Sequence, residues 1–107
     1  MQHLTNAITN LVLLEDTNAK EVHGATYASH NEAFGVLAEE VQEADDDLGD
    51  VKRYMEHLLR YVRCDDVSGM RDALNAIQRT AVNAAAEAIQ VAAVCEKWMD
   101  GMQHDGS

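Results

Sequence analysis

The chain has 107 residues, enough for one domain with one modest hydrophobic core. It contains no proline and six glycines, which favours long uninterrupted helices, because proline removes a backbone donor and clashes inside a helix. Its 19 acidic and 8 basic residues give a formal net charge of −11, which argues against nucleic acid and anionic membranes as partners. We therefore expect a single all-α domain over residues 1–107, with a tail that frays from about residue 100.

The sequence also indicates a compartment. No basic stretch followed by an apolar one stands at the N-terminus, and no apolar run approaches membrane-spanning length. Cys64 and Cys95 do not have the spacing of a metal site. We expect a soluble cytoplasmic protein with reduced thiols.

Apolar residues at helical spacing predict a first amphipathic helix over about residues 3–20, followed by a loop from Val22 to Ala28. Ser29 and Glu32 form a capping-box pattern, which predicts the start of a second helix. Residues 45–50, rich in aspartate and containing a glycine, predict a break or bend. Before that break the helix carries one narrow apolar seam: Phe34, Leu37, Val41, Ala44 and Leu48.

A third helix is predicted through residues 51–62, and a turn over residues 63–69, where Asp66 or Ser68 can cap the helix that follows. This last helix would run for roughly 30 residues, about 45 Å, which is long for so small a domain. We expect either a bend or a partner chain that covers it. Its apolar seam is the longest in the chain: Met70, Leu74, Ile77, Ala81, Ala84, Ala88, Val91, Cys95 and Trp98.

Two acidic stretches flank the seams of the second and last helices. When the seams are overlaid, Glu40 matches Glu87 and Glu43 matches Gln90. Residues three apart are neighbours on a helix surface, so each pair can point two oxygens the same way. Hard cations such as Mg²⁺ take oxygen ligands and often share carboxylates with substrate phosphates. The pattern predicts a divalent-cation site between two helices, and a solvated acidic face is the alternative.

Polar residues of the last helix extend this hypothesis. Glu87 stands alone in an alanine-rich stretch, and an isolated carboxylate there is costly if it is buried without a partner. Asn83, Gln90 and Lys97 fall along the same side of the helix as Glu87, and Arg79 lies nearby. Lys97 is a candidate for contact with a phosphate, and a surface ion pair is the alternative.

The run HNEAFGVLAEEVQEADDDL, followed in the last helix by AAAEAIQVAAVCEK, resembles the MazG-like branch of the all-α nucleoside triphosphate pyrophosphohydrolases. The family pattern is EExxE on one helix and ExxD on a later one, and the resemblance covers residues 30–48 and 80–97. It implies that Glu40, Glu43 and Glu87 are metal ligands, and that Glu39 is a further ligand or orients the attacking water. Gln90 stands where the pattern has aspartate, which weakens metal binding.

The resemblance further implies a bundle of four to five helices completed by oligomerisation, as a homodimer or homotetramer. The implied reaction is hydrolysis of a (d)NTP to (d)NMP and pyrophosphate with Mg²⁺, or alternatively Mn²⁺. The expected metal ligands are Glu40, Glu43, Glu87 and Gln90, the expected catalytic residue is Glu39, and the expected substrate-binding residues are Lys97, Asn83 and Arg79. Candidates for contact with the base are His30, Asn31, Phe34 and Trp98.

Two other interpretations stay open. Gln90 and the net charge of −11 favour a non-catalytic acidic helical adaptor or inhibitor, which presents carboxylates to a basic partner and has lost full metal binding. Alternatively, the same fold and metal could act on another phosphorylated metabolite.

Overall fold

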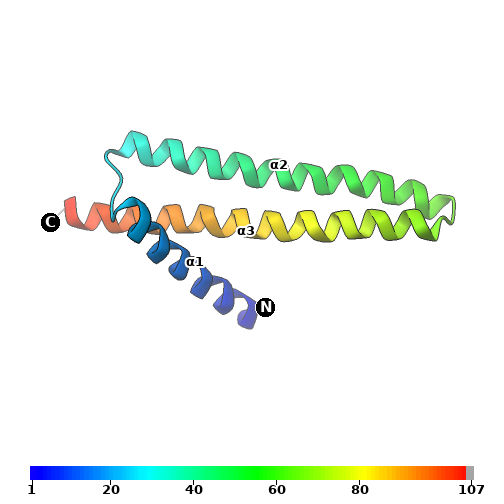
Figure 1. The fold of residues 1–107 in the computed structure, drawn as a ribbon, viewed down its shortest axis with the longest axis horizontal. Coiled ribbons are helices and arrows are strands. Elements are labelled where there is room, and N and C mark those ends of the chain that lie inside the picture. Colours follow the sequence, from blue (N-terminus) through cyan, green and yellow to red (C-terminus); the bar gives the residue numbers. More distant parts are fainter. Residues whose placement is uncertain (106–107) are drawn as a thin grey trace. The chain divides into compact units, whose positions relative to one another are not determined.

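The computed structural model describes residues 1–105, which form three α-helices: α1 (Gln2–His23), α2 (His30–Arg63) and α3 (Val67–Asp105) (Figure 1). The described range contains no strand, so the predicted all-α class is confirmed. Residues 100–105 continue α3, and the last two residues of the expected frayed tail lie outside the described range. No helix within residues 1–105 combines the length and the apolar character that a membrane span requires.

The predicted break at residues 45–50 is wrong, because α2 passes through this segment without interruption. A local side-chain contact stabilises the helix at each end of this segment. Gln42 Nε2 donates to Asp46 Oδ1 at 2.8 Å, and Arg53 Nη2 lies 3.1 Å from Asp50 Oδ1. The predicted second and third helices are therefore one helix. The described range has three helices, and the bundle of four to five that the resemblance implies stays a prediction.

The helices divide into two compact units. The first consists of Met1–Val41 together with the chain from Glu87 onward, so it holds α1, the beginning of α2 and the end of α3. The second, Gln42–Ala86, is a hairpin of the remaining parts of α2 and α3. Within the described range, the buried apolar residues are small: Ala33, Ala93 and Val94 in the first unit, and Ala73 and Ala84 in the second.

Polar contacts connect the three helical segments of the first unit. The Glu32 backbone N–H donates to Ser29 Oγ at 3.0 Å, which confirms the predicted start of α2. Trp98 Nε1 on α3 donates to His30 Nδ1 at 2.9 Å. Lys20 Nζ on α1 lies 2.6 Å from Asp100 Oδ2 on α3. The last two contacts join segments that are distant in the sequence.

The turn of the second unit depends on one capping residue and one close approach. The Gly69 backbone N–H donates to Asp66 Oδ1 at 2.9 Å, so Asp66 is the cap that the sequence predicted as one of two candidates. Asp65 has a positive φ of 55°, as residues that end a helix often do. A Cβ atom at Gly69 would lie 2.6 Å from Tyr61 Cγ, so only glycine fits beneath this ring.

We expect Gly69→Ala to lower the free energy of unfolding by about 1–3 kcal/mol, because the new methyl group overlaps the Tyr61 ring. Gly49→Ala is the matched control, since no atom of the described residues lies within 4 Å of its Cβ position. That change should raise stability by about 0.5–1 kcal/mol through helix propensity. Urea unfolding followed by circular dichroism measures both. Equal effects of the two changes would contradict the predicted overlap.

Candidate functional site

The first unit brings together two of the predicted metal ligands. Glu40 on α2 and Glu87 on α3 each offer a carboxylate oxygen, and these oxygens lie within 4.8 Å of each other. Both residues are half-buried. Two ionised carboxylates this close repel each other, and a bound cation removes the repulsion. Glu40 and Glu87, which the overlay of the seams aligned, thus lie close together, and the pair has the oxygen chemistry that Mg²⁺ prefers.

Glu43 follows Glu40 by one turn of the same helix. Its side chain is exposed. Glu39 is also exposed, next to Glu40 in sequence. The motif on α2 thus supplies one half-buried carboxylate and two more solvated ones.

Glu40 also lines a cavity of about 520 Å³ inside the first unit. Gln90 and Lys97 on α3 line the same cavity, and α1 contributes Glu15 and Asn18 to its wall. One metal-ligand candidate from each motif and the phosphate candidate Lys97 therefore share one cavity. The neutral side chain of Gln90 occupies the position where the family pattern has a charged carboxylate.

Lys97 is buried, with 5% of its surface exposed, so the alternative of a surface ion pair is wrong. Its Nζ lies 4.2 Å from the centroid of the Tyr27 ring. A cation at this distance is attracted by the negative face of an aromatic ring. Lys97 also lines the cavity that Glu40 lines, so its ammonium can contact an anionic ligand there.

Tyr27 is surrounded by negative charge. Burial raises the pKa of its phenol above the ordinary value of 10.0, and the charges of Asp16, Glu32 and Glu40 add to the rise. The phenol is thus held in its neutral form beside Lys97. Sequence patterns do not single out Tyr27, because it lies in the segment between α1 and α2 and has no helical periodicity.

We expect the protein to lose stability above about pH 10, and Tyr27→Phe to reduce that loss. The folded pKa of Tyr27 lies above its unfolded value of 10.0, so the unfolded chain releases its proton first as the pH rises. Hydrogen bonds to Asp100 and Asp16 likewise raise the pKa of Lys20 above 10.5, which adds to the alkaline loss. Urea midpoints at pH 8, 10 and 11 measure the slope. An unchanged slope in Tyr27→Phe would contradict this account of Tyr27.

Asp16 and Lys20 link α1 to α3 through Asp100. Asp16 is 5% exposed, and its Oδ2 lies 3.0 Å from Lys20 Nζ. Its other oxygen, Oδ1, is buried without a hydrogen-bond partner among the described residues. Lys20 also bonds Asp100 on α3, so one lysine connects two carboxylates from two helices. Neither Asp16 nor Lys20 belongs to a predicted motif.

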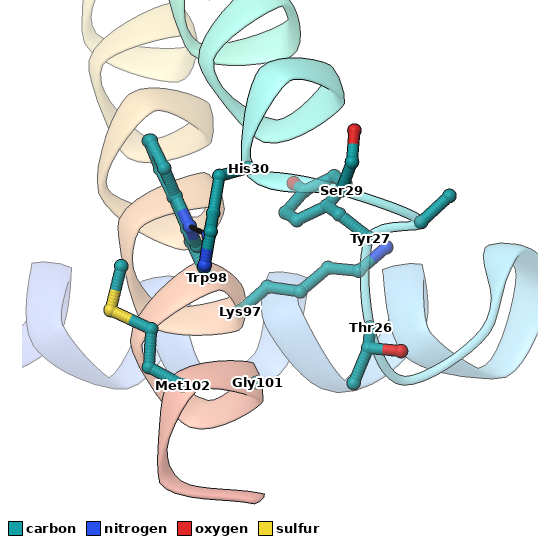
Figure 2. Close-up of a pocket in the computed structure, with 9 residues that line it drawn as sticks. Thr26, Tyr27, Ser29, His30, Lys97, Trp98, Gly101 and Met102 are labelled. Atoms are coloured by element: carbon teal, nitrogen blue, oxygen red, sulfur yellow. Dashed lines mark hydrogen bonds between the residues drawn. The ribbon is translucent and has the colours of Figure 1, made fainter. Parts of the chain in front are cut away.

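A second cavity of about 280 Å³ lies beside Lys97 in the first unit. Figure 2 shows its wall, with Trp98 and His30 next to each other and Tyr27 close to the end of Lys97. The Trp98 and His30 ring centroids are 6.0 Å apart. These two were among the base-contact candidates. The other two, Asn31 and Phe34, are exposed and line neither cavity.

Two of the predicted substrate-binding residues are placed elsewhere. Asn83 and Arg79 are both exposed and lie on the part of α3 that belongs to the second unit. Neither lines one of the two cavities. Their contact with a substrate stays a prediction, as do the metal and catalytic roles of the glutamates.

Comparison of the chain with protein-family models, with curated proteins and with solved structures finds no match. The resemblance to MazG-like pyrophosphohydrolases therefore rests on the two motifs in the sequence.

Proposed function

We propose that the protein is a Mg²⁺-dependent nucleoside triphosphate pyrophosphohydrolase of the MazG-like type, which converts a (d)NTP to the monophosphate and pyrophosphate. The observation that carries this proposal is the pair Glu40 and Glu87. The two residues lie on different helices, and their carboxylate oxygens lie within 4.8 Å of each other. Glu40 also lines the same cavity as the buried cation Lys97. Paired carboxylates beside a buried ammonium suit a metal-bound polyphosphate.

In this proposal each residue has a separate role. Glu40 and Glu87 hold the cation, and Glu43 and Gln90 are further oxygen ligands. The bound Mg²⁺ supplies charge neutralisation on the phosphate oxygens. Lys97 donates to a phosphate oxygen from within the cavity, and Tyr27 keeps its ammonium in place. Glu39, exposed to solvent, orients the attacking water.

The proposed enzyme is a cytoplasmic homodimer or homotetramer, in which further copies complete the helical bundle. The support is the apolar surface of the helices. In the first unit, Leu4, Leu11 and Leu14 on α1 and Phe34 on α2 are each about half exposed or more. In the second unit, Leu48, Met55, Leu59 and Val62 on α2 are similarly exposed. Apolar surface of this extent marks protein interfaces.

The first test is thermal unfolding with and without millimolar Mg²⁺ or Mn²⁺. A ligand at 100 times its dissociation constant stabilises the folded state by about 2.7 kcal/mol, so the melting temperature should rise. Sodium chloride at matched ionic strength controls for screening of the net charge of −11. Glu87→Gln should remove the metal-specific part of the shift. No shift with either ion in the unmodified protein would favour the non-catalytic adaptor or inhibitor.

A panel of (d)NTPs assayed by pyrophosphate release identifies the reaction. Release from at least one of them in the presence of Mg²⁺ is the expected result. A metal-dependent melting shift without release from any nucleotide would favour another phosphorylated metabolite as the substrate.

A further inference from the structure

We propose that the smaller cavity of the first unit is the binding site for the heteroaromatic base of the substrate. The proposal rests on the proposed function for the identity of the phosphate-bearing part of that ligand. The contacts that support it are those of Trp98, His30, Tyr27 and Lys97.

The Trp98–His30 contact fixes the chemistry of the imidazole. Trp98 Nε1 can only donate, so His30 Nδ1 accepts the bond at 2.9 Å. A neutral histidine that accepts at Nδ1 carries its proton on Nε2. His30 therefore offers an N–H donor. Nucleobases have in-plane carbonyl or ring-nitrogen acceptors for such a donor.

The wall of the cavity suits a flat ring. Trp98 and His30 both line it, and their planes are inclined by 34° with centroids 6.0 Å apart. The indole is partly exposed, so part of its surface is available for contact with a ligand. Stacking of a base on an aromatic side chain is a common and sequence-tolerant contact. The two rings are joined by a hydrogen bond, which orients this surface before a ligand binds.

Lys97 and Tyr27 connect this cavity to the carboxylates. Both residues line the smaller cavity and also the larger one, which Glu40 lines. A ligand with a base in the smaller cavity would therefore extend its anionic end past Lys97 toward Glu40. This order of aromatic, cationic and carboxylate groups matches the order of base, phosphate and metal in a metal-bound nucleotide.

The protein contains a single tryptophan, so its fluorescence reports directly on this cavity. We would titrate the intact chain with UMP, AMP and ribose 5-phosphate in buffer containing EDTA. At least one of the two nucleotides should quench or shift the Trp98 emission in a saturable way, whereas ribose 5-phosphate should leave it unchanged. An equal response to ribose 5-phosphate, or no response to either nucleotide, would overturn the proposal.

Two variants of His30 test the hydrogen bond. Asparagine keeps an acceptor near the Nδ1 position but has no donor near Nε2, whereas glutamine can place a donor there. His30→Asn should weaken nucleotide binding by about 3–10-fold, the effect of one lost hydrogen bond, and His30→Gln should weaken it less. Equal weakening by both would overturn the assigned donor role.

A variant of the carboxylate pair separates this proposal from the enzymatic one. Glu87→Gln should stop pyrophosphate release and keep a saturable Trp98 response to the nucleotide in EDTA. If the unmodified protein releases no pyrophosphate but shows the response, the enzymatic proposal fails and the base site stands. If it releases pyrophosphate without any response to nucleotides, the base site fails alone.

Discussion

Glu40→Gln is expected to lower nucleotide turnover by about 10³-fold or more. The substitution keeps the shape of the side chain and removes the charge that, in the proposed function, holds the cation together with Glu87. A metal ion contributes several kcal/mol of transition-state stabilisation, and each 1.36 kcal/mol is a factor of ten in rate. Pyrophosphate release measures the effect. The helical circular dichroism signal should be unchanged.

Glu56→Gln is the matched control, because it makes the same change in charge at an exposed position of α2 in the second unit. It should leave turnover within about twofold of the unmodified protein, since distant surface charges act weakly. Full activity in Glu40→Gln would refute the metal-binding role of Glu40.

Gln90→Asp tests the same site by adding a carboxylate instead of removing one. A further carboxylate in the cavity should tighten Mg²⁺ binding, seen as a larger melting shift.

Lys20→Met is expected to lower the free energy of unfolding by about 2–4 kcal/mol. Removal of the lysine leaves the Asp16 carboxylate buried and without its ionic partner, and an uncompensated buried charge is strongly destabilising. This loss is smaller than for a fully buried ion pair, because 27% of the Lys20 side chain is exposed and solvent screens its charge. The melting temperature should fall by roughly 10 °C or more. Differential scanning calorimetry measures this fall.

Arg53→Met controls for the loss of one positive charge from an acidic chain. Its ion pair with Asp50 is exposed on both sides and should contribute at most about 1 kcal/mol. Adding Asp16→Leu to Lys20→Met should recover part of the lost stability, because the buried charge is then absent. Equal losses from Lys20→Met and Arg53→Met would show that Asp16 is not a buried unpaired charge in the variant. Since α1 forms part of the larger cavity, loosening it should also weaken substrate binding.

Features that depend on residues close in the chain could be predicted from the sequence. The all-helical class followed from composition, and Ser29 was recognisable as a cap, with Asp66 one of two candidates for the next, because a cap bonds a backbone N–H only three residues away. The spacing within each acidic motif set which oxygens share a helix face. The overlay of two apolar seams aligned Glu40 with Glu87, but the closeness of their carboxylates depends on how α2 and α3 pack.

One local prediction failed for a thermodynamic reason. Residues 45–50 have low helix propensity, but each unfavourable residue costs at most about 1 kcal/mol. The side-chain contacts Gln42–Asp46 and Asp50–Arg53 stabilise the helix and offset part of this cost. Helix formation is also cooperative. A short unfavourable segment inside a long helix therefore does not end it.

What the sequence by itself determined is the helical class, two of the helix starts and the chemistry of the two acidic motifs, all of which arise from neighbours within one helical turn or from periodicity. Only the tertiary structure decided the burial of Lys97 against Tyr27, the Lys20–Asp100 ion pair and the Trp98–His30 hydrogen bond. The last two contacts join residues 80 and 68 positions apart. No periodic pattern encodes such pairs, because they depend on how the helices of the first unit pack.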